Sequence, residues 1–549
     1  MKEKFSSLQT VHFDVNFEDG RGDLTTSIAL QVAKKAGLPP RTIAEALSKG
    51  LASVKGVEKV EIAGAGFVNV ILETGAIIAG LKIARKACTP MKSRKAKPIV
   101  VDYSAPNIAK PLGIHHILST VIGQSIVNLY QQQGYETVSI NHIGDWGTQF
   151  GKLAVAFEKW GKKPVKQHSI DELLTLYVRF HDELEKDPSL EELGRRAFSD
   201  LEKGDEKLRS FWESVVDITM RSMDDMYQRL SVRFDRTMGE SFYEKMMTPI
   251  IEEGKKKGVF QEGKEGALIV NFAEELKMPP AIAVKADGST IYLTRDLATA
   301  RYRIDEWHPE AILYVVDIAQ QLYFRQLFAT LKLLGWELPH LEHVIFGRMR
   351  FADKSMSTRK GNILKLDEVL DEAVKRASAI IKERGEKIQT DDPKSLAEMM
   401  GVGSVVYGVL SQNRKMDMVF DWDKMLSFEG NSAPYLQYTH ARAKSVLRKA
   451  GSEGKDVSVK ELTNKERHLL KLIFLFGETI EAARREHLPH ILANYLYELC
   501  QAFNSFYASD EILTATGSTR DFRLHLTASA ADILKTGATI LTLRVPERM

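Results

Sequence analysis

The chain of 549 residues is 44% hydrophobic and 27% charged, and these proportions predict a folded globular protein of roughly three or four domains. Its net charge of +3 neither requires nor excludes a nucleic-acid partner, because such binding depends on a local patch of charge and not on the total. Neither of the two cysteines, Cys88 and Cys500, has a CxxC partner, so the sequence indicates neither a disulfide framework nor a zinc site built from cysteines.

The sequence contains no signal for export or membrane insertion. The N-terminal residues MKEKFSSLQT lack an apolar leader core. No apolar run reaches the roughly 18–20 residues that a membrane span needs. Two isolated thiols also suit a reducing compartment. We therefore expect a cytoplasmic protein that makes no membrane contact.

The first 90 residues predict a small α+β domain. The stretches TTSIALQVAKKAG and PRTIAEALSKGL have helical spacing, and VEKVEIAGAGFVNVIL is typical of two strands around a glycine-rich turn. A basic stretch follows at residues 82–98, with seven Lys or Arg residues and no acid. We interpret it as a solvated linker, with a contact to a phosphate backbone as the alternative.

The next elements predict one β-α-β unit of a parallel sheet. IVVDYS (99–104) is typical of a buried strand. Residues 111–134 have the spacing of a helix that ends at Gly134, and TVSIN (137–141) is typical of a second strand. Strand, helix and strand within about 40 residues indicate a parallel sheet.

The remaining chain divides into three patterns. Residues 155–260 are charged and helical, and they predict an insertion into the α/β domain. Strand signals return in GALIVNF, AIAVKADGSTIYLT, AILYVVD and HVIFGRM. After about residue 400 these signals end, and long amphipathic helices such as HLLKLIFLFGETIEAARREH predict a separate bundle.

Two stretches are candidates for a ligand site. DYSAPNIAKPLGIHH follows the first strand of the sheet, where the free N–H groups of a helix start bind anions. It contains neither GxGxxG nor a Walker-type lysine loop. A histidine at a helix start usually has a structural role. FADKSMSTRKGNIL (351–364) is hydrophilic and basic, so it is either a solvated turn or a loop that closes on a polyphosphate.

Five motifs together resemble the arginyl-tRNA synthetases, a family of class I aminoacyl-tRNA synthetases. They are SAPNIAKPLGIHHILST, NHIGDWGTQFGKL, IYLTRDLATA, KSMSTRKGN and FEGNSAPYLQYTHAR, and their order and spread cover nearly the whole chain. The resemblance implies an α/β fold, with a class I synthetase Rossmann-like parallel-sheet catalytic domain at 98–395. A helical insertion is expected at about 155–260. It also implies a small N-terminal α+β add-on domain at 1–90 that contacts tRNA, and an all-α anticodon-binding bundle at 400–549.

The resemblance assigns the ATP site to two signatures. His116 matches the last histidine of the first signature and is expected to donate a hydrogen bond to phosphate. The catalytic residues it implies are His116, Lys110, Lys354 and Lys360. The first signature comprises Pro106, Asn107, Ile108, Ala109, Lys110, Pro111, Leu112, Gly113, Ile114, His115 and His116. The phosphate loop comprises Ser355, Met356, Ser357 and Thr358.

The resemblance also implies a pocket for arginine. A guanidinium is a planar fork of donors that carboxylates and amide oxygens match best. The matched positions are Asp102, Ser104, Asn107, Tyr292, Asp296 and Gln320. The simpler alternative for Asp296 is an ion pair with Arg295 or Arg301 on an exposed helix. Tyr323 stands where relatives often have histidine.

The implied reaction joins arginine to tRNA(Arg) through an arginyl-adenylate made from ATP. Mg²⁺ would accompany ATP and be held by phosphate oxygens and water, so no protein ligands for a metal are expected. Tyr435, Tyr438, Tyr495 and Tyr497 are candidates for stacking on unpaired bases, or for the core of the bundle. The expected partners are tRNA(Arg), L-arginine and ATP, and we expect a monomer.

Two departures from the family pattern motivate an alternative function. His115 stands where the signature has glycine, and Leu118 stands where relatives usually carry arginine. The alternative is an RNA-binding synthetase paralogue with weakened or lost adenylation. A nucleotidylyltransferase of the same superfold is a third hypothesis, which the C-terminal bundle disfavours.

Overall fold

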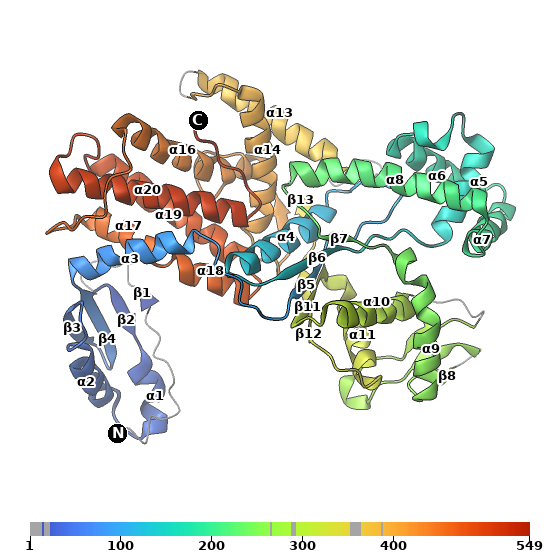
Figure 1. Ribbon diagram of the computed structural model, residues 1–549, viewed down its shortest axis with the longest axis horizontal. Helices are drawn as coiled ribbons and strands as arrows, with labels where there is room; N and C mark the ends of the chain where they lie inside the picture. The colour runs from blue at the N-terminus through green and yellow to red at the C-terminus, as the bar shows by residue number, and fades with distance from the viewer. Residues whose placement is uncertain (1–13, 16–21, 264–265, 287–291, 352–363, 386–387) are drawn as a thin grey trace.

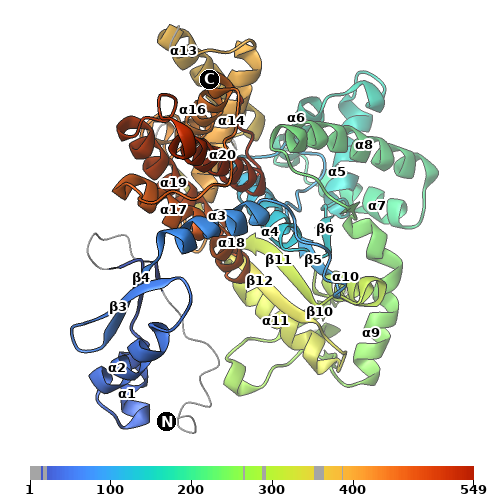
Figure 2. The same ribbon diagram turned by 60° about the vertical axis from the view of Figure 1, so that its left-hand side comes forward.

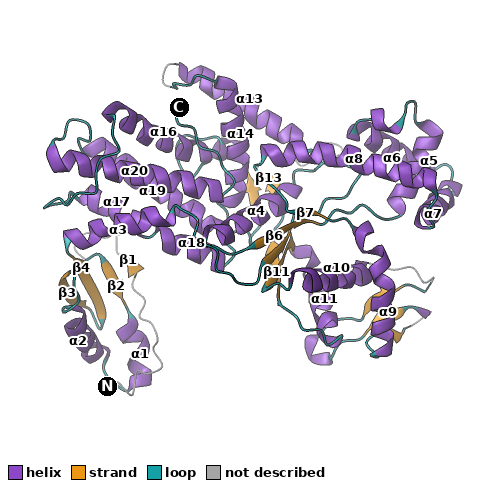
Figure 3. Ribbon diagram, viewed as in Figure 1, coloured by secondary structure: helices purple, strands orange, loops and turns teal. Residues whose placement is uncertain are grey.

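The computed structural model describes residues 14–15, 22–263, 266–286, 292–351, 364–385 and 388–549. Within these residues the chain forms an N-terminal module, a central parallel sheet with helices around it, and a C-terminal helical bundle (Figure 1). Strands gather in the N-terminal module and in the middle of the molecule, whereas the C-terminal part is almost entirely helical (Figure 3).

The N-terminal module is a four-stranded antiparallel sheet covered by two helices. The strand order is β1-β2-β4-β3. Ala29, Ala44 and Val68 form the centre of its small core. Its elements are β1 (Asp14–Val15), β2 (Leu24–Thr26), α1 (Ile28–Ala36), α2 (Pro40–Leu51), β3 (Val57–Ala63), β4 (Phe67–Leu72) and the connecting helix α3 (Thr74–Ala87).

The central sheet is parallel throughout, in the order β12-β11-β5-β6-β7. From β5 the chain builds outward to β6 and β7, and then returns to build β11 and β12 on the other side. The neighbours β5 and β11 therefore form the switch point at which open α/β sheets bind ligands. The strands are β5 (Ile99–Asp102), β6 (Thr137–Asn141), β7 (Arg236–Thr237), β11 (Ala311–Asp317) and β12 (His340–Phe346).

Helices cover both faces of this sheet, which explains why β5 is buried along its whole length. Alternate strand residues point to opposite faces. Val101 packs in one core with α4 (His116–Gln132), and Val100 packs in another with α10 (Tyr292–Trp307) and α11 (Gln321–Leu333). Turning the molecule by 60° shows the N-terminal module standing apart from this layered part (Figure 2).

Two groups of elements lie between β6 and α10. The helices before β7 have a core of their own around Phe150 and Leu173. They are α5 (Thr148–Trp160), α6 (Ile170–Leu184), α7 (Ser189–Glu202) and α8 (Glu206–Arg229). After β7 come the 3-10 helix η3 (Glu240–Met246), α9 (Met247–Lys256), β8 (Gln261–Glu262), β9 (Leu268–Val270) and β10 (Ala281–Val284).

The C-terminal part is a bundle of long helices. The N-terminal helix α3 packs against α17 and α20 of this bundle. Its elements are α13 (Leu366–Arg384), α14 (Pro393–Leu410), α15 (Trp422–Met425), α16 (Ala433–Ala450), α17 (Asn464–Phe474), α18 (Phe476–Arg485), α19 (Pro489–Ser509) and α20 (Gly517–Ile540). Two short parallel strands, β13 (Met349–Phe351) and β14 (Met418–Phe420), lie at its junction with the sheet. Over the described residues, none of the helices is long and apolar enough to cross a membrane.

The predicted α/β class and the first β-α-β unit are confirmed, with three corrections. The strand signals GALIVNF and AIAVKADGSTIYLT do not join the parallel sheet, because β9 and β10 pair antiparallel in a separate small sheet with β8. From Tyr292 onward the second of these stretches is helical, because Leu293, Leu297 and Ala300 share one buried face of α10. The helix predicted from residue 111 begins later, at His116.

Gly123 of α4 is required because this helix packs closely on Tyr103, the residue that follows β5. A Cβ at this position would lie 2.2 Å from Cγ of Tyr103. Gly123→Ala should lower the stability of the protein by about 1–3 kcal/mol, since overpacking forces side chains or backbone to move. The measurement is the apparent melting temperature. Gly75→Ala, also in a helix but with no atom within 4 Å, is the control and should leave it unchanged or higher. Equal losses in both variants would contradict this packing argument.

Candidate active site

Two cavities open at the switch point between β5 and β11. The larger has a volume of about 960 Å³ and the smaller about 410 Å³. Ala105, Val316 and Gln320 line both cavities, so the two share a wall. This arrangement suits a reaction in which two ligands meet at the carboxyl ends of parallel strands.

The loop after β5 has a strained backbone that is fixed from several sides. Ser104, Ala105 and Ala109 have φ values of 70°, 47° and 66°, in the left-handed region that residues with a Cβ rarely adopt. Their N–H groups donate to side chains of neighbouring elements: Ser104 to Ser119 at 2.9 Å, Ala105 to Asn141 at 3.2 Å and Ala109 to Thr219 at 3.1 Å. Strain held in this way is common where a backbone must be positioned for a ligand.

Gly113 fixes the ring of His116 at the start of α4. His116 Nδ1 lies 3.0 Å from Gly113 N and 3.2 Å from Gly113 O. Burial, followed by the neighbouring His115, lowers the pKa of His116 to about 4. Both histidines line the larger cavity. The exposed ring of His115 lies beside that of His116, with 4.0 Å between the ring centroids.

The first signature is joined to the segment that follows the predicted phosphate loop. Ile114 N–H donates to Leu364 O at 2.9 Å, and Leu366 N–H donates to Leu112 O at 2.8 Å. These bonds hold residues 112–115 outside α4, which explains the late start of that helix. Lys354, Ser355, Met356, Ser357, Thr358 and Lys360 lie outside the described residues. The residues on both sides of them, Phe351 and Leu364, line the larger cavity.

The other residues of the first signature are divided between core and surface. Ile108 and Ala109 pack into the core of the inserted helices, and Leu112 and Ile114 pack into the main core. Pro106 is buried and Pro111 is partly buried. Lys110 is exposed, with its Nζ 4.9 Å from the ring centroid of Tyr177 in α6. It is not among the described residues that line either cavity.

The smaller cavity brings together five of the six residues predicted for arginine. Asp102, Asn107, Tyr292, Asp296 and Gln320 all line it. The sixth, Ser104, lines the larger cavity, where its buried hydroxyl bonds to the hydroxyls of Tyr227 and Thr120 at 2.9 Å. Asn107 can lie close to the neighbouring chain because Gly144 has no side chain: a Cβ there would lie 2.2 Å from Asn107 Oδ1.

Two of the three acids in this cavity are already paired. Arg303 Nη1 donates to Asp102 Oδ2 at 2.7 Å, and both groups are buried. Arg295 Nη1 lies 2.7 Å from Glu240 Oε2. The simpler alternative for Asp296 is therefore wrong, because Arg295 pairs with Glu240, and Arg301 pairs with Asp305. Asp102 is also not the free acid that the sequence suggested, since one of its oxygens is occupied.

The charges of this cavity do not balance. Three carboxyls (Asp102, Glu240 and Asp296) face two guanidinium groups, which leaves one negative charge if all three are ionised. Burial raises the pKa of Asp296 to about 6 and that of Glu240 to about 7. Burial costs a carboxylate less when a cation neutralises it. The pocket is therefore suited to a ligand that supplies one positive charge.

The sequence reasoning missed three charged or titratable residues that line the smaller cavity: His142, Glu240 and Arg295. It also missed Arg303, which pairs with Asp102 of this cavity. His142 falls within the quoted motif NHIGDWGTQFGKL, and burial lowers its pKa to about 4. Its Nδ1 is buried and has no hydrogen-bond partner among the described residues. The sequence indicated a residue such as Arg303 only indirectly. Asp102 stands at the end of a buried central strand, and a buried acid there requires a cation.

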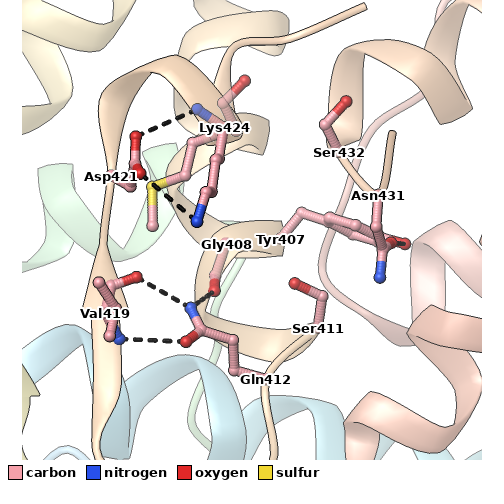
Figure 4. Close-up of a pocket in the computed structure, with 11 residues that line it drawn as sticks. Tyr407, Gly408, Ser411, Gln412, Val419, Asp421, Lys424, Asn431 and Ser432 are labelled. Carbon is pink, nitrogen blue, oxygen red and sulfur yellow. Dashed lines mark hydrogen bonds and ion pairs between the residues drawn. The ribbon is translucent and has the colours of Figure 1, made fainter. Parts of the chain in front are cut away.

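A third cavity, of about 300 Å³, lies where α14 meets β14 and α15 (Figure 4). Its polar side chains already bond to one another. Gln412 donates to Gly408 O at 2.7 Å and accepts from Val419 N–H at 3.0 Å. Tyr407 donates to Asn431 Oδ1 at 2.6 Å. The candidate chemistry therefore lies at the switch point and not here.

The four tyrosines of the bundle fall into two classes. Tyr495 is buried and donates to Leu472 O at 2.9 Å, so it belongs to the core. Tyr435, Tyr438 and Tyr497 are only partly buried. The guanidinium of Arg442 lies over the ring of Tyr438, with its Cζ 4.7 Å from the centroid of that ring.

Comparisons with known proteins identify the family of the chain. The family described as "tRNA synthetases class I (R), catalytic domain" matches residues 80–422. An arginine–tRNA ligase of Fusobacterium nucleatum is 38% identical over 548 residues, which are 99% of this chain and 96% of the relative. The chain belongs to the arginyl-tRNA synthetase family.

The other matches extend over both ends of this synthetase. An arginyl-tRNA synthetase N-terminal domain matches residues 4–72, and a DALR anticodon-binding domain matches residues 436–549. An arginine–tRNA ligase of Clostridioides difficile is 42% identical over 83% of this chain and 80% of the relative. The fold is that of the Thermus thermophilus arginyl-tRNA synthetase, with a TM-score of 0.84 at 24% identity over 100% of this chain and 98% of that one. The resemblance and the Rossmann-like fold class are confirmed.

The buried pair Asp102–Arg303 should be the most sensitive point of the synthetase site. Arg303→Met should destabilise the protein by about 3–5 kcal/mol, because it leaves a carboxylate buried without its cation. The matched control is Arg301→Met on the same helix, which breaks an exposed pair with Asp305 and should cost about 1 kcal/mol or less. The measurement is the apparent melting temperature of each variant. Similar decreases in both would show that burial of the pair does not govern stability.

Proposed function

We propose that this chain is an arginine–tRNA ligase that uses ATP to activate L-arginine and transfers it to the 3′ end of tRNA(Arg). The observation that carries the proposal is the smaller cavity, in which three carboxyls face two guanidinium groups. A guanidinium ligand supplies the missing positive charge and matches carboxylate geometry. The larger cavity, which His116 lines, lies beside it and takes ATP.

In the proposed reaction the α-carboxylate of arginine attacks the α-phosphorus of ATP and pyrophosphate leaves. The shared wall of the two cavities brings the two reacting groups together. His116 donates from Nε2 to a phosphate oxygen, and its lowered pKa keeps it neutral. Lys110, Lys354 and Lys360 supply positive charge to the phosphates, and Mg²⁺ enters with ATP as part of that substrate.

The substrate amino acid is held along its length. Asp296 receives the guanidinium, with Tyr292 and the second oxygen of Asp102 in the same lining. Asn107 and Gln320, of which Gln320 also lines the larger cavity, hold the α-amino and carboxylate groups. Ser104 supports the loop from the larger cavity.

The proposal extends to the organisation of the protein. Residues 1–90 and 400–549 contact tRNA, and residues 98–395, with a helical insertion at about 155–260, carry the reaction. We further propose that the protein acts as a monomer in the cytoplasm. The arginine-type pocket favours a ligase over the paralogue without adenylation, because an RNA-binding protein has no use for it.

The test is arginine-dependent exchange between ATP and pyrophosphate, together with charging of tRNA(Arg). We expect exchange with arginine and tRNA present and none with lysine, because an ammonium does not pair with carboxylates in two places at once. We also expect exchange to require tRNA, as is common in this family. Equal charging of lysine and arginine would contradict the assignment of the pocket. Absence of any exchange or charging would favour the paralogue.

The His115 ring should reduce the affinity for ATP. It is exposed in the larger cavity at the position where the family signature has glycine. His115→Gly should lower the KM for ATP by about three- to tenfold, which corresponds to roughly 0.7–1.4 kcal/mol. His115→Ala removes the same ring without the added backbone freedom of glycine, so it should give a similar gain. If both variants bind ATP as the parent does, the ring does not obstruct the site.

A further inference from the structure

Tyr323 lies at the inner wall of the smaller cavity and bonds directly to Asp296. The hydroxyl at the start of α11 donates to Asp296 Oδ2 on α10. Both side chains line the cavity and are partly buried. The bond occupies one carboxylate oxygen and leaves Oδ1 for a ligand.

Charged or titratable groups of several elements line the cavity together with Asp296. They are Arg295 on α10, Asp102 at the end of β5, Glu240 of η3, His142 after β6, Tyr314 of β11 and Tyr323 of α11. Arg303 on α10, which pairs with Asp102, also lowers the pKa of Asp296. The two arginines are each committed to another acid. Among the described residues, Tyr323 is the one side chain that donates a hydrogen bond to Asp296.

A hydrogen bond donated to a carboxylate stabilises its ionised form. Burial works in the opposite direction and raises the pKa of Asp296 to about 6, with the bond from Tyr323 lowering it. Tyr323 stays a neutral donor, because burial and the neighbouring Asp296 raise its own pKa well above the usual value.

We propose that Tyr323 is a positioning residue that keeps the Asp296 carboxylate ionised and turned toward the guanidinium of the substrate. The inference rests on the proposed function, since it requires arginine in this cavity. It assigns a role to a position at which relatives often have histidine.

The proposal predicts how the KM for arginine depends on pH. The cationic substrate binds the ionised form of Asp296, so the KM rises as the pH falls through the pKa of that carboxyl. Tyr323→Phe removes a bond that lowers this pKa, so the rise begins at a higher pH. The ratio of KM values, variant over parent, is expected to be about fivefold at pH 6 and to approach one near pH 8.5. The kcat should change little, because Tyr323 is not among the described residues that line the larger cavity, the proposed ATP site.

The experiment measures kcat and KM for arginine in tRNA charging from pH 6 to pH 8.5. Tyr314→Phe is the matched control, because this hydroxyl faces the same cavity and has no hydrogen-bond partner among the described residues. It should leave the midpoint of the pH dependence in place. Glu240→Gln removes the other carboxyl that titrates near neutral pH, and the effect of Tyr323→Phe should persist in that background.

A double-substitution cycle tests whether Tyr323 acts through Asp296. In the Asp296→Asn background, Tyr323→Phe should raise the KM for arginine no further. A KM ratio that stays constant with pH, or equal effects of Tyr314→Phe, would overturn the inference and leave the proposed function intact. A parent that charges no tRNA with arginine at any pH would overturn the proposed function itself, and this inference with it.

Discussion

The buried ion pair between Asp102 and Arg303 determines how the smaller cavity is built. It joins the end of the first parallel strand to the last turns of α10, and neither group is exposed enough for water to replace its partner. A buried carboxylate without a cation is strongly unfavourable, so α10 must lie where Arg303 reaches the strand. That placement directs Asp296, two helical turns earlier, into the same cavity. The proposed substrate acid, Asp296, is thus positioned by an ion pair within the protein.

The smaller cavity can select a cationic ligand because one of its three acids has no cationic partner among the described residues. Asp102 and Glu240 are neutralised by arginines of the protein, whereas Asp296 is supported by one neutral hydroxyl. Burial raises the pKa of Asp296 and that of Glu240 in this cavity. A ligand that brings one positive charge in a planar fork relieves this imbalance, and an ammonium does so with poorer geometry.

Within the described residues, backbone conformation and backbone hydrogen bonds, and not ion pairs, hold the loop beside the larger cavity, the proposed ATP site. The left-handed residues Ser104, Ala105 and Ala109 aim the loop after β5, and backbone bonds to Leu364 and Leu366 hold residues 112–114 in place. The bundle contacts this region through the sheet. His487, which follows α18, bonds to Glu342 of β12 at 3.1 Å and to Tyr130 of α4 at 2.8 Å. Helix α3 continues this contact toward the N-terminal module, where buried Asp23 pairs with Arg467 of α17.

The sequence by itself determined the α/β class, the first β-α-β unit and the helical C-terminal bundle, because hydrophobic periodicity is a local property. The resemblance to the arginyl-tRNA synthetases, and not periodicity, named the five predicted residues that line the smaller cavity. Only the tertiary structure decided which acids of the smaller cavity form an ion pair within the described part of the chain and which one does not. Asp102 meets Arg303 across 201 residues, Glu240 takes Arg295 away from Asp296, and Tyr323 reaches Asp296 from the next helix. Ion pairs between residues so far apart in sequence depend on how the chain folds in space, and a local sequence pattern does not predict this. The departure of α10 from the predicted strand has the same cause, because its buried face exists only against the sheet that it covers.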